Sequence, residues 1–420
     1  MEKEFLKSSS RSVTLNITGG KIDSYREQEE TTGTVRVYAD GKIGVAGCLG
    51  EPEEEQLTAQ AEKALELGIP YVSALDGALE RAEDRSEEIL PEKELIPAMQ
   101  TMLDKVGAAC PGFAISNKIS LNWDSEEYRN SKGRKLRSTD SSLTVSLLFQ
   151  SRGSGNLMDA FYEYNSRSFD PEKIAASCKA VYDAYHTPAE LEEGEWPVII
   201  SPMELLGPAI SHFVGEMYTA GASLLSGKLG EKCFSEKFTF GDDRNAATHP
   251  GSCFFDAEGT VRPEDRGLLV QNGTLAALAT TKNSAAIFGL PVSGHAHAAY
   301  DGVPSLGMNG LYVAKTAESI AQVVPGKAVY VMSASGGDYT PSGHYATPVQ
   351  MAYLVEKGTV VGRLPELNIS DLVRNADILE QVRAAAKTII EQDPTLTAPQ
   401  HRILKQKIQK MFGERIQLRL

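Results

Sequence analysis

Two groups of histidine and carboxylate side chains have the types and spacing that could do chemistry in this sequence. His212 and Glu216 are four residues apart, so a helix would present both on one face, as zinc sites built on helices do. Residues 294–297 read GHAH, and along a strand the two alternating imidazoles would point the same way. With His344 they would form a triad only if two separated loops converged. We favour a polar helix face for the first group, and metal binding is the alternative for both.

An N-terminal half of mixed strands and helices is the first set of elements that must position such residues. Gly19-Gly20 and Asp40-Gly41 favour the positive-φ turns of tight hairpins, which predicts a three-strand meander over residues 11–48. The charged run from Arg26 to Glu30 is expected to be a solvated turn. Further strands are expected over 113–166, and helices over 51–68, 91–110 and 171–186, the last with Asp170 as its N-cap.

The second half begins with a short strand, PVIIS, and a helix that is expected to run from Gly207-Pro208 to about Gly221. Asn272-Gly273 and Lys357-Gly358 predict hairpins, and several such pairs without helices between them indicate an antiparallel sheet or barrel. We therefore predict an α+β fold class with three parts. They are an N-terminal α/β domain with antiparallel strands (1–190), a mainly β, barrel-like C-terminal domain (191–370) and a helical C-terminal tail (371–420).

Composition and charge exclude several classes of function. The chain has 420 residues and a net charge of −14, so its surface should repel nucleic acid and anionic lipid, and we expect direct contact with neither. It contains no apolar run long enough for a transmembrane helix, and its N-terminus has no apolar signal region. Its five cysteines are scattered and never form CxxC, which indicates a reduced, cytoplasmic protein.

Four segments of the second half carry a resemblance to a known family. They are GASLLSGKLGE (221–231), CFFDAEGT (253–260), LLVQNGTLAAL (268–278) and YTPSGHYATPVQMAYLVEKGTV (339–360). Together they resemble the TldD/PmbA family, also called the peptidase U62 or modulator-of-DNA-gyrase family. The resemblance implies an α/β N-terminal domain and a mainly β C-terminal domain. Its glycine- and histidine-bearing loop implies peptide-groove candidates here, namely Gly294, His295, His297 and, in the following segment, Asn309.

The same resemblance shows which chemistry is missing. Active members of the family carry a zinc-binding HExxxH, and alignment on 221–231 places that window at LGPAIS. Leu206 and Ser211 then stand where the two histidines should be, and Gly207 stands where the glutamate should be. The third ligand implied by the family is a cysteine near the C-terminus, and no cysteine follows Cys253. The chain therefore resembles the metal-free PmbA, or TldE, branch, and we expect no metal or other cofactor of its own.

Three hypotheses about function follow from the sequence. The leading one is a non-catalytic subunit that pairs with a TldD-like protease, which would carry the zinc while an extended peptide substrate passes between the subunits. The second is an active metallopeptidase with displaced ligands, for which His212 and Glu216 are the fallback metal candidates. The third is a homodimeric peptide-binding or scaffold protein, because a pairing surface would otherwise be exposed in the isolated chain.

Overall fold

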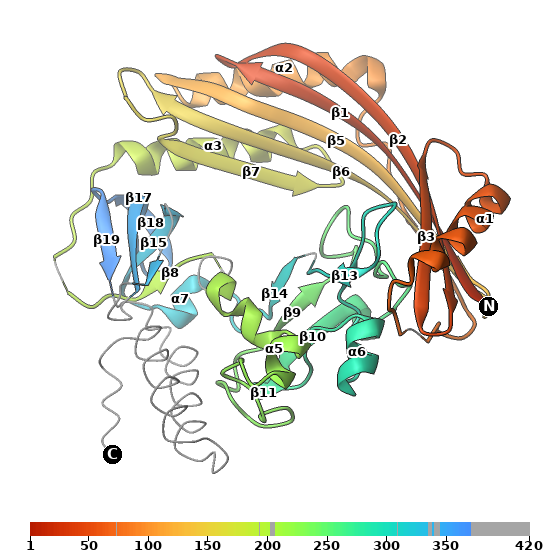
Figure 1. The fold of residues 1–420 in the computed structure, drawn as a ribbon. Coiled ribbons are helices and arrows are strands. Elements are labelled where there is room, and N and C mark those ends of the chain that lie inside the picture. The colour runs from red at the N-terminus through yellow and green to blue at the C-terminus, as the bar shows by residue number, and fades with distance from the viewer. Residues whose placement is uncertain are drawn as a thin grey trace, which may run out of the picture. The chain divides into compact units, whose positions relative to one another are not determined.

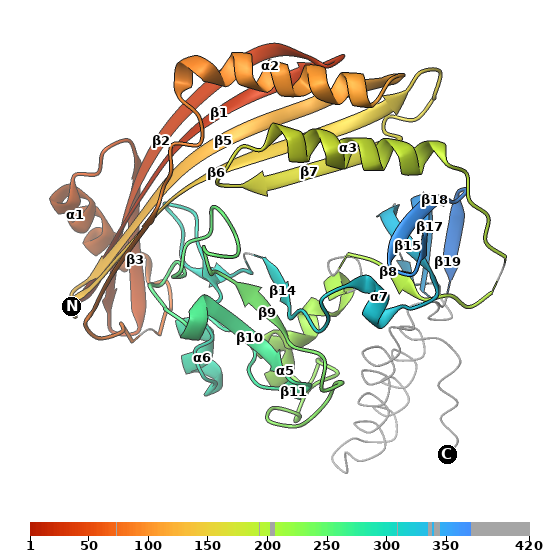
Figure 2. The same ribbon diagram turned by 180° about the vertical axis from the view of Figure 1, so that it is seen from behind.

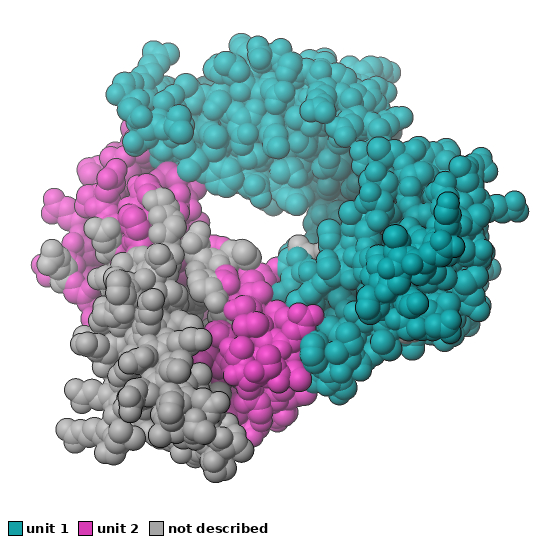
Figure 3. All heavy atoms as spheres, viewed as in Figure 1, with its two compact units in different colours: residues 1–182, 242–267, 279–310 teal, residues 183–241, 268–278, 311–420 magenta. Residues whose placement is uncertain are grey.

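The computed structural model describes residues 1–72, 74–192, 194–201, 206–308, 310–334, 338–339 and 345–370. These residues form two compact units, coloured in Figure 3. The first comprises residues 1–182, 242–267 and 279–310, and the second comprises 183–241, 268–278 and the described residues from 311 onward. The division is thus discontinuous along the chain, whereas the sequence-based prediction has three continuous parts with boundaries at residues 190 and 370. The predicted C-terminal tail, 371–420, lies outside the described residues.

The first unit is built on a long sheet of seven strands in the order β3-β2-β1-β5-β6-β4, with β7 also paired to β6 (Figure 1). Only β4 pairs in parallel with its neighbour. The strands are β1 (Glu2–Thr18), β2 (Lys21–Ala39), β3 (Lys42–Leu49), β4 (Leu79–Arg85), β5 (Phe113–Asn130), β6 (Arg134–Ser151) and β7 (Ala160–Ser166). The predicted meander is confirmed, with positive φ at Gly19, Gly20, Asp40 and Gly41. The predicted charged turn from Arg26 to Glu30 is wrong, because these residues lie inside β2, where cross-strand pairing with β1 holds them extended.

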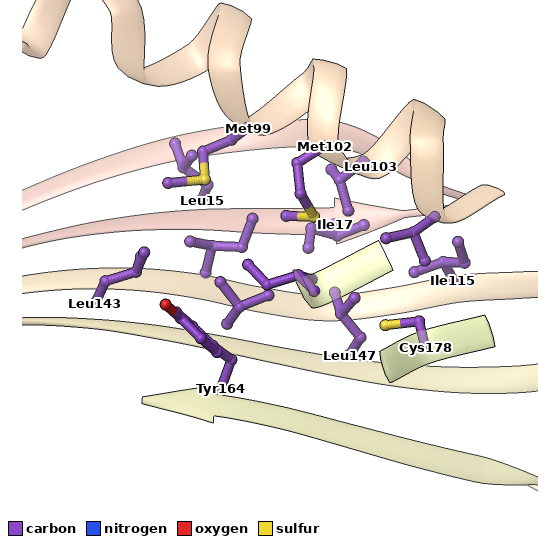
Figure 4. Close-up of a cluster of buried hydrophobic side chains, with 14 of the residues drawn as sticks. Leu15, Ile17, Met99, Met102, Leu103, Ile115, Leu143, Leu147, Tyr164 and Cys178 are labelled. Atoms are coloured by element: carbon purple, nitrogen blue, oxygen red, sulfur yellow. The ribbon is translucent and has the colours of Figure 1, made fainter. Parts of the chain in front are cut away.

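The two faces of this sheet differ because successive side chains point to opposite sides. Val13 and Leu15 of β1 point to the face that α2 (Glu92–Ala109) and α3 (Pro171–His186) cover, as Figure 2 shows. Figure 4 shows the apolar core between these helices and the strands, in which Met99, Met102 and Leu147 are fully buried. The other face carries polar side chains over much of its length, and it is the one that loops of the same unit approach.

The predicted helices of the first half are present with the expected ends. The first is α1 (Glu54–Ala64), continued by the 3₁₀ turn η1 (Leu65–Leu67) and ended by Gly68 in the left-handed conformation. It packs Leu57 and Ala61 against Val35 and Val37 of β2. Asp170 caps α3 as predicted, with its Oδ1 accepting a hydrogen bond from Lys173 N at 2.9 Å.

Shorter elements complete the first unit. A helix, α6 (Lys282–Phe288), begins with a capping box in which Thr281 and Ser284 exchange hydrogen bonds between side chain and backbone. A two-stranded ribbon pairs β12 (Ala296–His297) with β13 (Ser305–Leu306), and a 3₁₀ turn, η3, spans Pro263–Asp265. These elements lie in the two inserted segments of the first unit, which are the segments that carry the site described below.

The second unit contains a six-stranded sheet in the order β16-β17-β15-β8, with β18 and β19 also paired to β17. Its strands are β8 (Val198–Ile199), β15 (Lys327–Ala334), β16 (Asp338–Tyr339), β17 (Tyr345–Glu356), β18 (Thr359–Arg363) and β19 (Leu367–Ser370), and a short helix α7 spans Ile320–Val323. A separate four-stranded sheet has the order β11-β10-β9-β14. Its strands are β9 (Phe240–Asp243), β10 (Arg266–Gln271), β11 (Thr274–Leu275) and β14 (Leu311–Val313), and the unit boundaries fall inside β9 and β10.

The predicted hairpins of the second half are confirmed. Asn272 and Gly273 have φ of 47° and 79°, and Lys357 and Gly358 have φ of 50° and 80°, as two-residue hairpin turns require. The mixed α+β class is also confirmed, although the described strands form open sheets and do not close into a barrel.

The predicted helix over 207–221 is only partly correct. The chain forms a 3₁₀ helix, η2 (Gly207–Phe213), and then a short α-helix, α5 (Gly215–Thr219). Val214 between them has φ −80° and ψ 128°, which is extended backbone. Its side chain is β-branched, a type that helices accommodate less well than strands do. The single continuous helix face expected from the sequence therefore does not exist.

Candidate functional site

The residues at the degenerate motif positions do not provide metal ligands. The Leu206 side chain is an alkyl group and is buried, and Gly207 begins η2 without a side chain. Ser211 is exposed near the end of η2 and offers one hydroxyl group. A catalytic zinc site needs three strong protein ligands and a base for its water, and these three residues supply none of the imidazole or carboxylate groups involved. The residues present therefore do not fit the zinc that the family resemblance implies.

The fallback candidates His212 and Glu216 lie on different elements. His212 is in η2 and Glu216 is in α5, with the extended Val214 between them, so their four-residue spacing does not place them on one helix face. His212 Nδ1 instead faces the backbone N–H of Leu224 at 3.4 Å, and burial lowers the pKa of His212. Among the described residues, no three His, Cys, Asp or Glu side chains are grouped so that they could hold a metal ion.

The two histidines of the GHAH segment occupy opposite environments. His295 is completely buried, whereas His297 in β12 is exposed. The expectation that both imidazoles point the same way is therefore wrong, because His295 lies before the ribbon and faces the interior. His297 and Gly294 stay candidates for a peptide groove, and Asn309 and His344 lie outside the described residues.

His295 belongs to a buried polar network of the first unit. Its Nδ1 is 2.8 Å from Ser293 Oγ, and its Nε2 is 3.4 Å from Asp242 Oδ1. Burial, reinforced by the positive charges of Arg244 and Arg262, lowers the pKa of His295 to about 4. Burial also raises the pKa of Asp242 to about 6, although the ion pair with Arg244 opposes that rise.

This Ser-His-Asp arrangement is structural. The hydroxyl of Ser293 is buried and lies within hydrogen-bond distance of Thr280 N at 2.6 Å and Thr280 O at 3.2 Å, so no substrate atom can approach it. The network ties strand β9 to the 293–297 loop. A nucleophilic serine would need an exposed Oγ beside its base.

Asp256 and Glu258 hold the turn that contains them. Asp256 Oδ1 accepts hydrogen bonds from Glu258 N and Thr260 N, both at 2.9 Å, and its Oδ2 accepts one from Ala296 N at 3.1 Å. Glu258 accepts from Tyr71 Oη at 2.6 Å and from Lys282 N at 2.8 Å. Both carboxylates are thus occupied in holding the loops of the first unit.

A cavity of about 520 Å³ lies on the polar face of the long sheet, within the first unit. Strands β1, β2, β5 and β6 form its floor, and the segments 251–257 and 296–300 border it. Its lining includes the carboxylates of Asp124 and Glu126 and the guanidinium groups of Arg36 and Arg244. His297 also lines it, so the cavity includes one of the predicted peptide-groove candidates.

The carboxylates of this cavity were missed by sequence reasoning, although a signal was present. In the segment DSEEY, alternate residues Asp124, Glu126 and Tyr128 lie on one side of β5, and the register of β5 against β1 and β6 continues that face with polar residues. An acidic pair that alternates along a strand is recognisable from the sequence. The sequence does not reveal that this acidic pair lies in one cavity with arginines from distant segments of the chain.

Comparison with known proteins shows similarity along most of the chain. A family model described as the PmbA/TldA metallopeptidase C-terminal domain matches residues 193–410, and one described as PmbA/TldA metallopeptidase domain 1 matches residues 4–68. The chain is 25% identical over 258 residues to a zinc metalloprotease TldD homolog of Saccharolobus solfataricus, covering 58% of each protein. It is 28% identical over 196 residues to a metalloprotease of Methanothermobacter thermautotrophicus, covering 44% of this chain and 42% of that protein.

The fold is also similar to a solved structure. The crystal structure of TldE from Thermococcus kodakarensis matches with a TM-score of 0.71 and 19% identity, covering 89% of this chain and 88% of that one. At this identity the likeness concerns the fold alone. The sequence matches above span only about half the length of the two metalloprotease relatives, 58% and 42%.

Proposed function

The chain belongs to the PmbA/TldD metallopeptidase family, and we propose that it is the non-catalytic subunit of a two-subunit, TldD-type metalloprotease. The observation that carries the proposal is the residue content of the motif positions. Leu206, Gly207 and Ser211 cannot bind zinc or activate water, and none of the seven histidines in the sequence is followed by glutamate, so HExxxH occurs nowhere in the chain.

In this proposal the chemistry resides on a TldD-like partner, and this chain contributes binding surface. The zinc, its water and the general base would belong to that partner, since the residues here do not fit a metal site. The chain would form part of the surface along which the peptide binds. The polar cavity on the sheet of the first unit, which His297 lines, supports this role. An extended peptide can also pair its backbone with a sheet edge, a common mode of peptide recognition.

The test is reconstitution with a TldD-like relative that carries HExxxH, which we expect the same genome to encode. Each protein is purified alone and as a mixture, and three quantities are measured: the mass of the complex, the bound zinc and the cleavage of an unfolded peptide. We expect this chain alone to bind less than about a tenth of an equivalent of zinc and to cleave nothing. We expect the mixture to form a complex whose cleavage rate exceeds that of the partner alone.

A control separates the contributions of the two chains. A Glu→Gln substitution in the motif of the partner should abolish cleavage while leaving the complex intact. Chelator-sensitive cleavage by this chain alone would refute the proposal and favour displaced ligands. A stable homodimer that ignores the partner would favour the scaffold hypothesis instead.

A further inference from the structure

Most charges that line the sheet cavity are already neutralised by residues of the same unit. Three have partners outside the lining: Arg36 pairs with Glu4 at 2.8 Å, Arg244 with Asp242 at 3.3 Å, and Asp140 with Arg167 at 2.5 Å. Asp256 accepts hydrogen bonds from three backbone N–H groups, as described above. Among the described residues, the lining charges without a protein partner are therefore the remaining carboxylates.

Among the described residues, three lining carboxylates besides Asp256 form no ion pair, and two of them, Asp124 and Glu126, are neighbours on β5, whereas the third, Glu30, lies on β2. Asp124 and Glu126 are two residues apart, so both side chains point to the same side of the sheet. Glu126 accepts one hydrogen bond, from Ser8 Oγ at 2.6 Å. Within the described part of the chain, neither carboxylate forms an ion pair and Asp124 accepts no hydrogen bond, although Glu30 adds a further negative charge to the lining.

Arg244 also lines this cavity. Its side chain is only 4% exposed, Nη1 donates to Phe255 O at 3.2 Å, and Nε lies 3.3 Å from Asp242 Oδ2. Its Nη2 is buried, and among the described residues neither Nη2 nor Nε has a hydrogen-bond partner. A buried donor without an acceptor is costly, so the missing acceptor is expected to come from outside the chain. A neutral carbonyl oxygen would satisfy it without adding charge.

We propose that this cavity binds a lysine or arginine residue of a peptide, with Asp124 and Glu126 pairing with its cation and Arg244 donating to its backbone carbonyl oxygen. The inference deepens the proposed function, on which it rests for the peptide nature of the ligand. Two carboxylates make an incomplete site for a metal ion, and no metal-binding group of three side chains occurs among the described residues. They are a sufficient partner for an ammonium or guanidinium group.

A cation bound between the two carboxylates would counteract the effect of burial on their pKa values. Burial raises the pKa of Glu126 to about 7, and burial together with the negative charge of Asp140 raises the pKa of Asp124. A bound cation would favour the charged forms and reverse both shifts.

The test is direct calorimetric binding of blocked alanine peptides to the full-length chain at about pH 8, where acidic side chains are ionised. One peptide carries a single central lysine, and its match carries norleucine, which has nearly the same length without the charge. We expect the lysine peptide to bind about tenfold tighter, a difference of about 1.4 kcal/mol in binding free energy, because hydrogen bonds to charged groups are stronger than those between neutral ones. Asp124→Asn and Glu126→Gln should each reduce that ratio, and the double variant should bring it close to one.

Matched controls keep the test specific. Glu127→Gln changes the next residue of β5, which points to the opposite face and pairs with Arg137 at 3.7 Å, and it should leave the ratio unchanged. Asp124→Asn is the variant of choice if others fold poorly, because within the described residues the Asp124 side chain makes no hydrogen bond that its loss would break. Thermal unfolding of every variant checks that the fold is intact.

Three results would overturn the inference: equal affinity for the lysine and norleucine peptides, an unchanged ratio in the double variant, or binding of butylamine, the monocation of the lysine side chain, as tightly as the lysine peptide. The last result would mean that no backbone carbonyl is recognised. The measurement uses the chain alone and does not need cleavage. A lysine preference without any activity gain from the partner would therefore support this inference while refuting the proposed function.

Discussion

His295 Nε2 lies 3.4 Å from Asp242 Oδ1, and both side chains are completely buried. The pair joins strand β9 to a loop about fifty residues later, inside the first unit. Burial is the main cause of the pKa shift of each side chain, because it disfavours the charged form: it lowers the pKa of His295 and raises that of Asp242. At neutral pH His295 is therefore uncharged, and the contact with Asp242 depends on packing as much as on charge.

The stability of the first unit should decrease in acid because of His295. Its pKa is about 4 in the folded chain and 6.5 ordinarily, so the unfolded chain binds the proton first as pH falls. The contribution of His295 is therefore complete above pH 6.5 and is lost as pH falls towards 4. Between pH 7 and 4.5 the free energy of unfolding should decrease by about 2 kcal/mol more in the wild type than in His295→Gln.

Urea unfolding at several pH values measures this difference. Asp242 has the opposite effect, because its pKa is raised in the folded chain, so its contribution to the free energy of unfolding increases as pH falls through about 6. The His295→Gln variant retains Asp242, so the comparison with the wild type isolates the effect of His295. An equal acid-induced loss in both proteins would show that His295 is not the group responsible.

Gly267 is required for space rather than for backbone conformation. A Cβ at this position would overlap Asp242 Oδ1 and lie 2.9 Å from His295 Cε1. Gly267→Ala should therefore lower the free energy of unfolding by about 2 kcal/mol or more, as overpacking of a buried site does. Gly107→Ala is the control, because nothing lies near its Cβ and the residue is in α2, where alanine should stabilise by about 0.5–1 kcal/mol. Thermal unfolding of the two variants measures this difference. An unchanged stability of Gly267→Ala would mean that Asp242 and His295 move easily to make room for the methyl group.

Glu4 should be among the most sensitive positions of the long sheet. Its buried carboxylate accepts hydrogen bonds at 2.8 Å from Arg36 Nη1, Tyr38 Oη and Tyr128 Oη. Glu4→Ala would leave the Arg36 charge buried and uncompensated, so we expect a loss of about 3–5 kcal/mol in the free energy of unfolding. Glu2→Ala on the same strand, which removes a half-exposed pair with Lys132, should cost less than about 1 kcal/mol. Comparable losses in the two variants, measured by denaturant unfolding, would contradict this assignment.

Binding of a lysine peptide should weaken in acid through Glu126. Its pKa of about 7 means that lowering the pH protonates the carboxylate, and a neutral carboxyl group cannot pair with the cation. From about pH 8 to 6 the affinity should fall several-fold, which is part of the about tenfold preference that the two carboxylates contribute together, and the Glu126→Gln variant should show a much smaller change. Ser8 from β1 and Asp124 from β5 face the same carboxylate, and Cys253 stays neutral because burial raises its pKa to about 12. Calorimetry over this pH range tests the prediction, and a flat wild-type profile would exclude Glu126 as the pairing group.

Local patterns explain where the sequence-based predictions succeeded. Hairpins at Gly19-Gly20 and Asn272-Gly273, and the N-cap of Asp170, depend on the conformational preferences of a few neighbouring residues, which the sequence displays directly. The predictions failed where tertiary contacts override such preferences. Arg26 to Glu30 resemble a turn but are held extended by pairing with β1, and the helix after Gly207 is broken at Val214.

By itself the sequence determined the family, the mixed α+β class and the absence of HExxxH, because these depend on residue identity and short-range order. Only the tertiary structure decided that His295 is buried while His297 is exposed, and that Asp124 and Glu126 share a cavity with Arg244. Burial and the approach of distant segments are set by strand register and by the loops that border the sheet. The pKa shifts and the unpaired charges of the site arise from that arrangement, so the chain order alone could not reveal them.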